Sequence, residues 1–558
     1  MRRIVPFAIV LSALTFTGCS VLERASGTRS AARAGSGEER LAPLFDNLGD
    51  LHHEITTSSP LAQRYFDQGL TLTYGFNHAE AIRSFRAAAH YDPDCAMCYW
   101  GVAYALGPNI NAPMGDESVA PAWEALARAV ELAPGASVRE QAYIRALAER
   151  YTAEPPADRA PLDRAYADAM REVTKAHPDD LDAQTLLAEA LMDTTPWDYY
   201  RPDGRPKPVT EEITGLLESV LAVEPDHPGA IHFYIHAVEA SAEPERAEAG
   251  ADRLASLVPG AGHLVHMPSH IYYRVGRYDD AVSANEMAAA ADESYISQCR
   301  AQGFYPALYY PHNIHFLYAA ASEEGRSKEA LAAAKKLVDA APEDSFAKFP
   351  MLEEFRPVYL FALARFGRWS EILEEPAPGA SLHYSIGMWR YARGMASVGT
   401  GHIDDARAEL DQVRAAESKP EISGLVLASG SKATDLLRIA GNVLGAALAA
   451  AERDRNREIE LLRAAMQIQD SLPYTEPPPW YFSVRQALGR ALLRAGRAPE
   501  AERVYREDLV KHPKSGWALY GLAESLGAQH KAGEAAAARR EFDVAWTRAD
   551  VAPTVFYP

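Results

Sequence analysis

Small residues, large apolar residues and prolines recur along the chain at fixed offsets. From Gly69, an alanine follows after 12 residues, a phenylalanine after 16 and a proline after 24. The same offsets from Gly489 lead to an alanine, a tyrosine and a proline. Small residues let two helices approach closely, a large residue fills the gap to the next pair, and proline stops the second helix. The pattern therefore predicts consecutive helical hairpins in an all-α chain.

Partial matches to this pattern continue through the chain. They contain Ala122, Ala247, Gly276, Gly325 and Gly401. These residues resemble the tetratricopeptide repeat, a helix–turn–helix unit of 34 residues. The resemblance implies an α-solenoid of about twelve hairpins between residues 60 and 550, curved into a superhelix with a concave groove. We expect one array over 44–558, with a subdivision near 415–435 as the alternative.

Several hairpins carry insertions rich in proline, glycine and aromatic residues. We expect these segments to be loops: 107–120, 152–161, 193–210, 296–310, 374–386, 417–434 and 471–481.

The N-terminus has the pattern of a secretion signal. Arg2 and Arg3 precede an apolar run over 4–16, and small residues lead directly to Cys19. This arrangement resembles a bacterial lipoprotein signal, which implies cleavage after residue 18 and lipidation of Cys19. Residues 19–43 then form the lipidated cysteine and a flexible tether. Because Ser20 follows the cysteine, the resemblance implies the outer membrane, facing the periplasm; a plain signal peptide with a chance cysteine is the alternative.

Composition narrows the class of function. The 558 residues have ordinary globular usage and a formal net charge of −20. An acidic chain without a basic surface is not expected to bind nucleic acid. No apolar stretch after residue 18 is expected to span a membrane. The sequence contains no P-loop, His-Glu-x-x-His or Gly-x-Ser-x-Gly motif.

Seven of the 17 histidines follow the repeat register. When the small residue of the second helix is numbered 20, they fall at positions 2, 5 and 9 of the first helix, in three consecutive repeats. They are His232, His236, His263, His266, His270, His312 and His315. These positions form one stripe of a helix. In the tetratricopeptide family this stripe lines the concave groove, so the resemblance implies that the seven rings point into one groove.

Acidic residues and a proline accompany the histidines. Glu239 falls at position 12 of the His232 hairpin, and Glu189 at position 9 of the preceding one. Pro268 lies within a first helix, and we expect it to kink that helix or end its first turn, which would re-aim His266 relative to His270.

Imidazoles spaced i, i+4 give a metal two ligands from one helix, and imidazole suits zinc, copper, iron and nickel. We therefore expect one or two transition-metal ions in the groove. Two other interpretations remain: a groove that binds an anionic or peptide ligand, as in a metal-free interaction scaffold, and core histidines that satisfy their hydrogen bonds internally. A metal-dependent enzyme would further need an open coordination position and a base, for which Glu239 and Glu189 are candidates.

Two blocks around these histidines resemble an uncharacterised group of bacterial tetratricopeptide-repeat proteins. They cover residues 263–272 and 309–316. The resemblance supports the fold and implies no established activity. Tyr272 and Tyr273 are expected to pack or to give hydrogen bonds to metal ligands.

The remaining cysteines allow several interpretations. Cys95 and Cys98 are expected to form a disulfide or redox pair, a soft-metal pair, or two small buried residues. The position after Cys98 is tyrosine rather than histidine, which disfavours covalent haem. His52 and His53, before the array, are expected to be exposed to solvent, with folding over the groove as the alternative.

Overall fold

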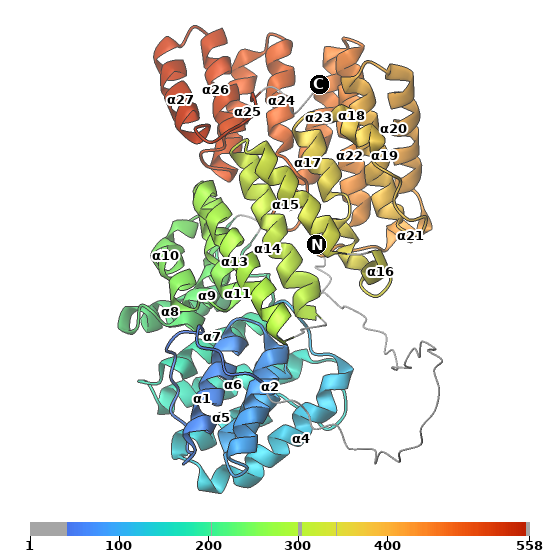
Figure 1. The fold of residues 1–558 in the computed structure, drawn as a ribbon. Coiled ribbons are helices and arrows are strands. Elements are labelled where there is room, and N and C mark those ends of the chain that lie inside the picture. Colours follow the sequence, from blue (N-terminus) through green and yellow to red (C-terminus); the bar gives the residue numbers. More distant parts are fainter. Residues whose placement is uncertain (1–41, 202–203, 300–303, 342, 554–558) are drawn as a thin grey trace, which may run out of the picture. The chain divides into compact units, whose positions relative to one another are not determined.

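The computed structural model describes residues 42–201, 204–299, 304–341 and 343–553 (Figure 1). Its helices form twelve successive pairs, as the sequence predicts. The first four pairs are α1 (Pro60–Tyr74) with α2 (His78–Tyr91), α3 (Ala96–Ala105) with α4 (Asp116–Leu132), α5 (Val138–Ala148) with α6 (Ala160–Ala176), and α7 (Leu181–Asp193) with α8 (Pro208–Val223). The next four are α9 (Pro228–Val238) with α10 (Glu248–Leu257), α11 (Gly262–His266) and α12 (Pro268–Val275) with α13 (Tyr278–Cys299), α14 (Phe304–Glu323) with α15 (Ser327–Ala340), and α17 (Val358–Arg365) with α18 (Trp369–Glu374).

The last four pairs are α19 (His383–Gly399) with α20 (Ile403–Glu417), α22 (Ala433–Ala451) with α23 (Arg455–Gln469), α24 (Val484–Arg494) with α25 (Ala498–Lys511), and α26 (Gly516–Ala528) with α27 (Ala532–Ala545). Short helices connect some pairs: η1 (Ala133–Gly135), η2 (Pro244–Ala247), α16 (Glu343–Phe346), η3 (Pro350–Phe355) and α21 (Pro420–Ser423). Within the described residues there are isolated β-bridges but no strands. The chain divides into two compact units, 1–233 and 234–558.

Glycines at the repeat positions admit the large side chain of the second helix. Phe85 of α2 fills the space between α1 and α3, where a Cβ added to Gly69 would lie 2.7 Å from its ring and one added to Gly101 would lie closer still. Tyr505 of α25 occupies the same place between the glycines of α24 and α26. The repeat offsets therefore correspond to real packing contacts at both ends of the array.

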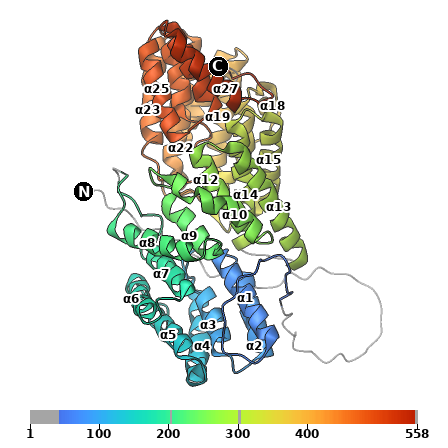
Figure 2. The ribbon, with the colours of Figure 1, turned by 90° about the vertical axis from the view of Figure 1, so that its left-hand side faces the viewer.

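The second unit folds back on itself. Tyr278 donates a hydrogen bond to the carbonyl oxygen of Pro513 (3.0 Å), and the indole of Trp517 donates to that of Ser322 (2.9 Å). Asp550, after α27, accepts from the backbone of Ser327 (2.7 Å). Residues of α13, α14 and α15 thus contact the last two helix pairs and the segment after them, which lie at the top of both ribbon views (Figures 1 and 2).

Two segments differ from expectation. Most of the described part of 296–310 is helical instead of a loop, because Tyr305 of α14 donates to Asp292 of α13 (3.0 Å) and Tyr309 packs edge-on against His263 (4.7 Å between ring centres). Among the described helices, α22 is long and apolar enough to cross a membrane, but two thirds of its apolar stretch is buried inside the protein. Helices α20 and α22, on either side of 415–435, pack against each other.

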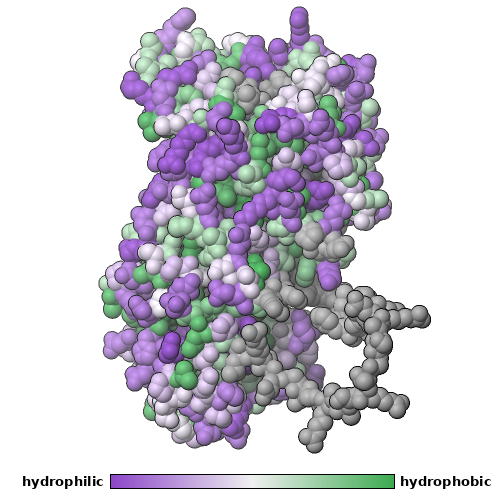
Figure 3. Space-filling view, in the orientation of Figure 1, coloured by the Kyte–Doolittle hydropathy of each residue, from purple (hydrophilic) through white to green (hydrophobic). Residues whose placement is uncertain are grey.

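Polar side chains predominate on the face shown in Figure 3.

Candidate metal centre

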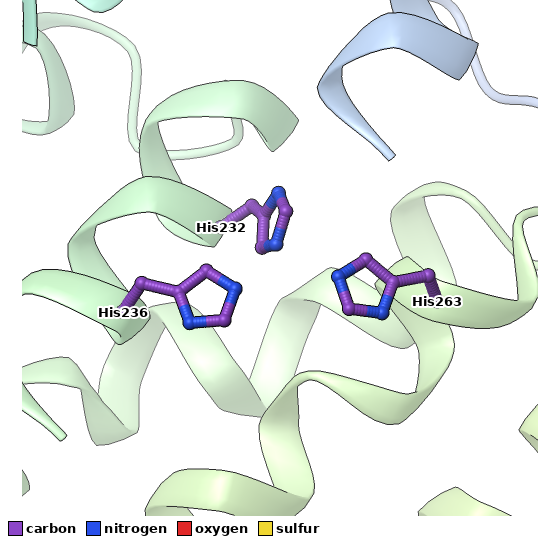
Figure 4. Close-up of side chains that lie close together, drawn as sticks. All are labelled: His232, His236 and His263. Atoms are coloured by element: carbon purple, nitrogen blue, oxygen red, sulfur yellow. The ribbon is translucent and has the colours of Figure 1, made fainter. Parts of the chain in front are cut away.

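Five of the predicted histidines lie together in the second unit. They are His236 on α9, His263 and His266 on α11, His270 on α12 and His312 on α14, and we call them the histidine cluster. Their ring centres are separated by 4.8 to 6.2 Å from neighbour to neighbour. Figure 4 shows His232 and His236 one turn apart on α9, with the ring of His263 turned toward His236.

Pro268 separates α11 from α12, as the sequence predicts. α11 ends at His266 and α12 begins at Pro268, because proline cannot donate the backbone hydrogen bond that would continue the helix. The break leaves His266 and His270 on one side, with their Nε2 atoms 2.9 Å apart. This is the closest approach between imidazole nitrogens in the cluster for which the described residues give a distance.

The Nδ1 atoms of these two rings point away from each other toward oxygen acceptors. His266 Nδ1 lies 2.6 Å from Oδ1 of Asn285 on α13. His270 Nδ1 lies 2.6 Å from Oε2 of Glu239, and His236 Nδ1 lies 2.9 Å from the other oxygen of the same carboxylate. Metal-ligating histidines are commonly held in this way, with one nitrogen donating to an oxygen and the other left for the metal.

Burial and the Glu239 carboxylate, which His236 and His270 share, determine the protonation of the rings in the histidine cluster. Burial alone would lower the pKa of His270, but the carboxylates of Glu239 and Glu476 outweigh it and raise the pKa to about 10. Burial alone would raise the pKa of Glu239, but His270 and His236 outweigh it and lower the pKa to about 2. Burial and the neighbouring rings hold the pKa of His266 and His312 well below the usual range. Without a metal, His270 and Glu239 form a buried imidazolium–carboxylate pair beside the neutral rings of His266 and His312.

Sequence reasoning did not find Glu476. This residue lies in the loop between α23 and α24, more than two hundred residues after His270, and is 5% exposed. Its Oε2 is 3.5 Å from His270 Nδ1, and Tyr474 donates to its Oε1 (2.5 Å). Asn285, at a helix position with no evident register signal, was missed in the same way. The loop position of 471–481 is as predicted, but its sequence carries no signal for this contact.

His315 lies apart from the histidine cluster, and His232 belongs to the end of the first unit. His315, one turn after His312, stacks on Tyr318 and meets Phe355 edge-on, and it lines a small cavity of about 30 Å³. Burial lowers its pKa to about 4. His232 Nδ1 lies 2.6 Å from the carbonyl oxygen of Tyr74 within the first unit. The prediction that all seven rings point into one groove is therefore wrong for His315. The cluster residues other than His312 are at most 4% exposed, so these rings are buried between helices.

Glu189 lies in a buried polar group of the first unit. Tyr104 donates to its Oε2 (2.8 Å), and Arg150 forms an ion pair with the neighbouring Asp193. Burial raises the pKa of the Glu189 carboxyl despite the attraction of Arg150. Among its described contacts there is no imidazole, so its predicted role beside the histidines has no support there.

The cysteine and N-terminal expectations have mixed outcomes. Cys95 and Cys98 form a disulfide at the start of α3, which agrees with the first of the three interpretations. His52 is largely exposed, whereas His53 is buried and its Nδ1 lies 2.7 Å from Asp182 Oδ2. The expectation of exposure was wrong for His53 because the segment before α1 packs on the first unit. Cys19, the signal 1–18 and nearly all of the tether 19–43 lie outside the described residues.

The cluster offers a nitrogen-rich ligand set with acidic neighbours. His266, His270 and His312 each have a nitrogen within 4.8 Å of the other two, as do the ligand atoms of Glu239, His270 and Glu476. Such a set can hold a transition-metal ion, or can relay a proton from His270 to His266.

No family model matches the sequence, and no curated protein matches it.

Solved structures with helical repeats are similar to this chain. They include the human IFIT1 dimer with m7Gppp-AAAA (9% identity, 88% of this chain and 91% of that chain, TM-score 0.33) and yeast Tom70 (13%, 88% and 93%, 0.27). A third is the APC/C hetero-tetramer Cut9–Hcn1 (11%, 89% and 89%, 0.29). The chain is an all-α solenoid of tetratricopeptide-type hairpins. Because the TM-scores are low, this fold class rests on the helix pairs and glycine contacts described above.

Proposed function

We propose that the second unit binds a transition-metal ion through His266, His270 and His312. The observation that carries this proposal is the opposed orientation of the first two rings. Their Nε2 atoms approach to 2.9 Å, while Asn285 and Glu239 hold their Nδ1 atoms. In the metal-free protein, the proton on His270 Nε2 fills this space; in the loaded protein, the ion replaces it.

The separation of the two nitrogens supports the proposal. Two imidazoles on one tetrahedral zinc, with bonds of about 2.0–2.1 Å, have nitrogens about 3.3 Å apart. The observed pair must open by about 0.4 Å, which small rotations of both rings supply. Zinc, copper and iron all suit imidazole. His236 and His263, adjacent to this set, are the ligands for a second ion, with Glu239 joining the two groups through its two oxygens.

The test is metal content after purification without added metal. We expect one or two ions per chain in the wild type, and about one ion fewer after His266→Ala plus His270→Ala. His315→Ala is the matched control, because that ring lies one turn from His312 and outside the cluster. Circular dichroism establishes that each variant folds. A wild type with less than about 0.2 ion per chain, also after incubation with excess zinc, would rule the proposal out.

A protein-interaction scaffold is the second candidate. Helical-repeat solenoids present extended binding surfaces, and the fold suits this role. It predicts a partner whose binding to the purified chain is unchanged by a chelator and by the double histidine variant. A metal-dependent enzyme, the third candidate, needs an open coordination position beside the ion. A change in the visible absorption of cobalt-substituted protein on addition of cyanide or azide would support that position.

We further propose that the protein is held at the outer membrane, facing the periplasm, by lipid on Cys19. Support for this comes from the sequence alone: the charged start, the apolar run and the small residues before the cysteine. Acyl chains bury enough methylene groups to retain a protein on a membrane. Cys19→Ala should move the protein from the membrane fraction to the soluble fraction, and equal distribution of both forms would contradict the proposal.

A further inference from the structure

The histidine cluster is too buried for an ion to reach it directly. His266 is 0% exposed and His270 is 4% exposed. A buried metal site requires an entry path. This question rests on the proposed function, because a path matters only if an ion travels along it.

An open pocket on the second unit shares one side chain, Arg274, with the surroundings of the cluster. The pocket has a volume of about 320 Å³ and is lined from the segment before η2, from η2, α10, the end of α12, the end of α25 and the segment after it. Arg274 belongs to its lining and extends inward. Its guanidinium donates to the carbonyl oxygens of Glu239 and Ser241, and its Nε lies 3.9 Å from Oε1 of Glu476. One side chain thus lines the pocket and also contacts the carboxylate of Glu476 and the backbone of Glu239, the two residues whose carboxylates face His270.

We infer that this pocket is the entrance for the cation and that Arg274 is its gate. The guanidinium carries a positive charge next to two buried carboxylates, Glu239 and Glu476. When it swings into the pocket, it exposes carbonyl and carboxylate oxygens, which are ligands for an incoming divalent cation. One cation replaces another, so the two carboxylates do not remain without a counter-charge in the interior.

The pocket lining carries charges of both signs: Glu245 and Glu248 lie in it together with Arg274 and Lys514. Glu248 is paired with Arg277, so Glu245 is the carboxylate of the lining that an approaching cation meets. Glu245 is exposed, so its attraction is screened by salt. Arg277, one turn nearer the surface, is occupied by ion pairs with Glu248, Asp252 and Asp280 and does not touch Glu476 among its described contacts.

The experiment compares the rate of zinc uptake by metal-free full-length protein, followed by stopped-flow competition with a chromophoric chelator. Arg274→Ala should take up zinc at least about tenfold faster than the wild type, at unchanged stoichiometry. Arg277→Ala, the matched control, should be within about twofold. Glu245→Lys should slow uptake at low salt but not at high salt, and Glu243→Lys, next to it but outside the pocket lining, should not. An Arg274→Ala rate within about twofold of the wild type would overturn the inference.

A second measurement separates the entrance from the metal. Diethyl pyrocarbonate modifies neutral imidazoles that the reagent can reach, and mass spectrometry reports modification of His236 and His266, whose pKa values are lowered, in metal-free protein. Arg274→Ala should accelerate that modification and Arg277→Ala should not. If the chain takes up no zinc, the proposed function fails while this result still decides whether Arg274 closes a passage. Equal modification rates in both variants would show that it does not.

Discussion

Replacement of Asn285 by leucine separates the role of this residue in metal binding from its role in folding. Asn285 Oδ1 accepts the Nδ1 proton of His266 at 2.6 Å, and its amide donates to the carbonyl oxygen of Ala281 within α13. In Asn285→Leu, the buried Nδ1 proton keeps only a long contact of 3.3 Å with Ser269 Oγ. We expect a loss of about 1–3 kcal/mol in the free energy of unfolding of the metal-free protein.

The effect on metal affinity follows from the orientation of the ring. Loss of a residue that orients a metal ligand typically weakens metal binding about 10–100-fold, or about 1.4–2.8 kcal/mol. Asn285→Asp is the matched control, because it also loses the bond to Ala281 but keeps an acceptor for His266 Nδ1. Its zinc affinity should equal or exceed that of the wild type.

The assay is a zinc competition titration of all three proteins, with urea unfolding of the metal-free forms. The expected order of zinc affinity places the aspartate variant at or above the wild type and the leucine variant at the bottom. A leucine variant that is destabilised yet binds zinc within about twofold of the wild type would show that Asn285 matters only for folding. An aspartate variant weaker than the leucine variant would refute the orientation argument itself.

Three further predictions concern stability. Burial alone would lower the pKa of His53, but Asp182 raises it, so the pair stabilises the fold fully below pH 6.5 and progressively less as the pH rises. In urea unfolding, the free energy of unfolding of His53→Ala should be about 1–3 kcal/mol below that of the wild type at pH 6, and this difference should shrink at pH 9. A difference that does not change with pH would contradict the reasoning. Burial raises the pKa of Glu354 from 4.5 to about 7, so the wild type should lose up to about 3 kcal/mol between pH 4.5 and 7 in urea unfolding, while Glu354→Gln should not. Gly101→Val should force its side chain against the Phe85 ring and lower stability by about 1–3 kcal/mol, and a melting temperature equal to that of the wild type would contradict the packing described for the repeats.

The repeat pattern was sufficient to predict the hairpins and most of the cluster. Glycine at the repeat positions is a steric requirement imposed by Phe85 and Tyr505, so it is visible in a single sequence. The same repeat register places the seven imidazoles on one helix face, and five of them do lie together. Pro268 was predictable for a similar reason, since its effect on a helix is local.

The parts of the site that come from distant segments could not be predicted. Glu476 reaches His270 from a loop whose neighbours in sequence give no sign of it, and Asn285 reaches His266 from the facing helix. His315 shares the register of the cluster yet faces another space, because α14 meets η3 and α17 as well as α11. A register states which side of a helix a residue occupies, but not which element will cover that side.

The contact between Glu476 and His270 changes how this array is expected to lose its structure. In a simple solenoid each repeat interacts with its neighbours only, so unfolding can begin at an end and proceed stepwise. Here Glu476, in the loop between the tenth and eleventh helix pairs, contacts His270 of the sixth pair. Trp517 and Asp550 connect the last pair and the segment after it to α14 and α15 through hydrogen bonds. Unfolding of the C-terminal helices would therefore expose the histidine cluster. A ligand bound to the cluster would make the second unit unfold cooperatively, as one unit.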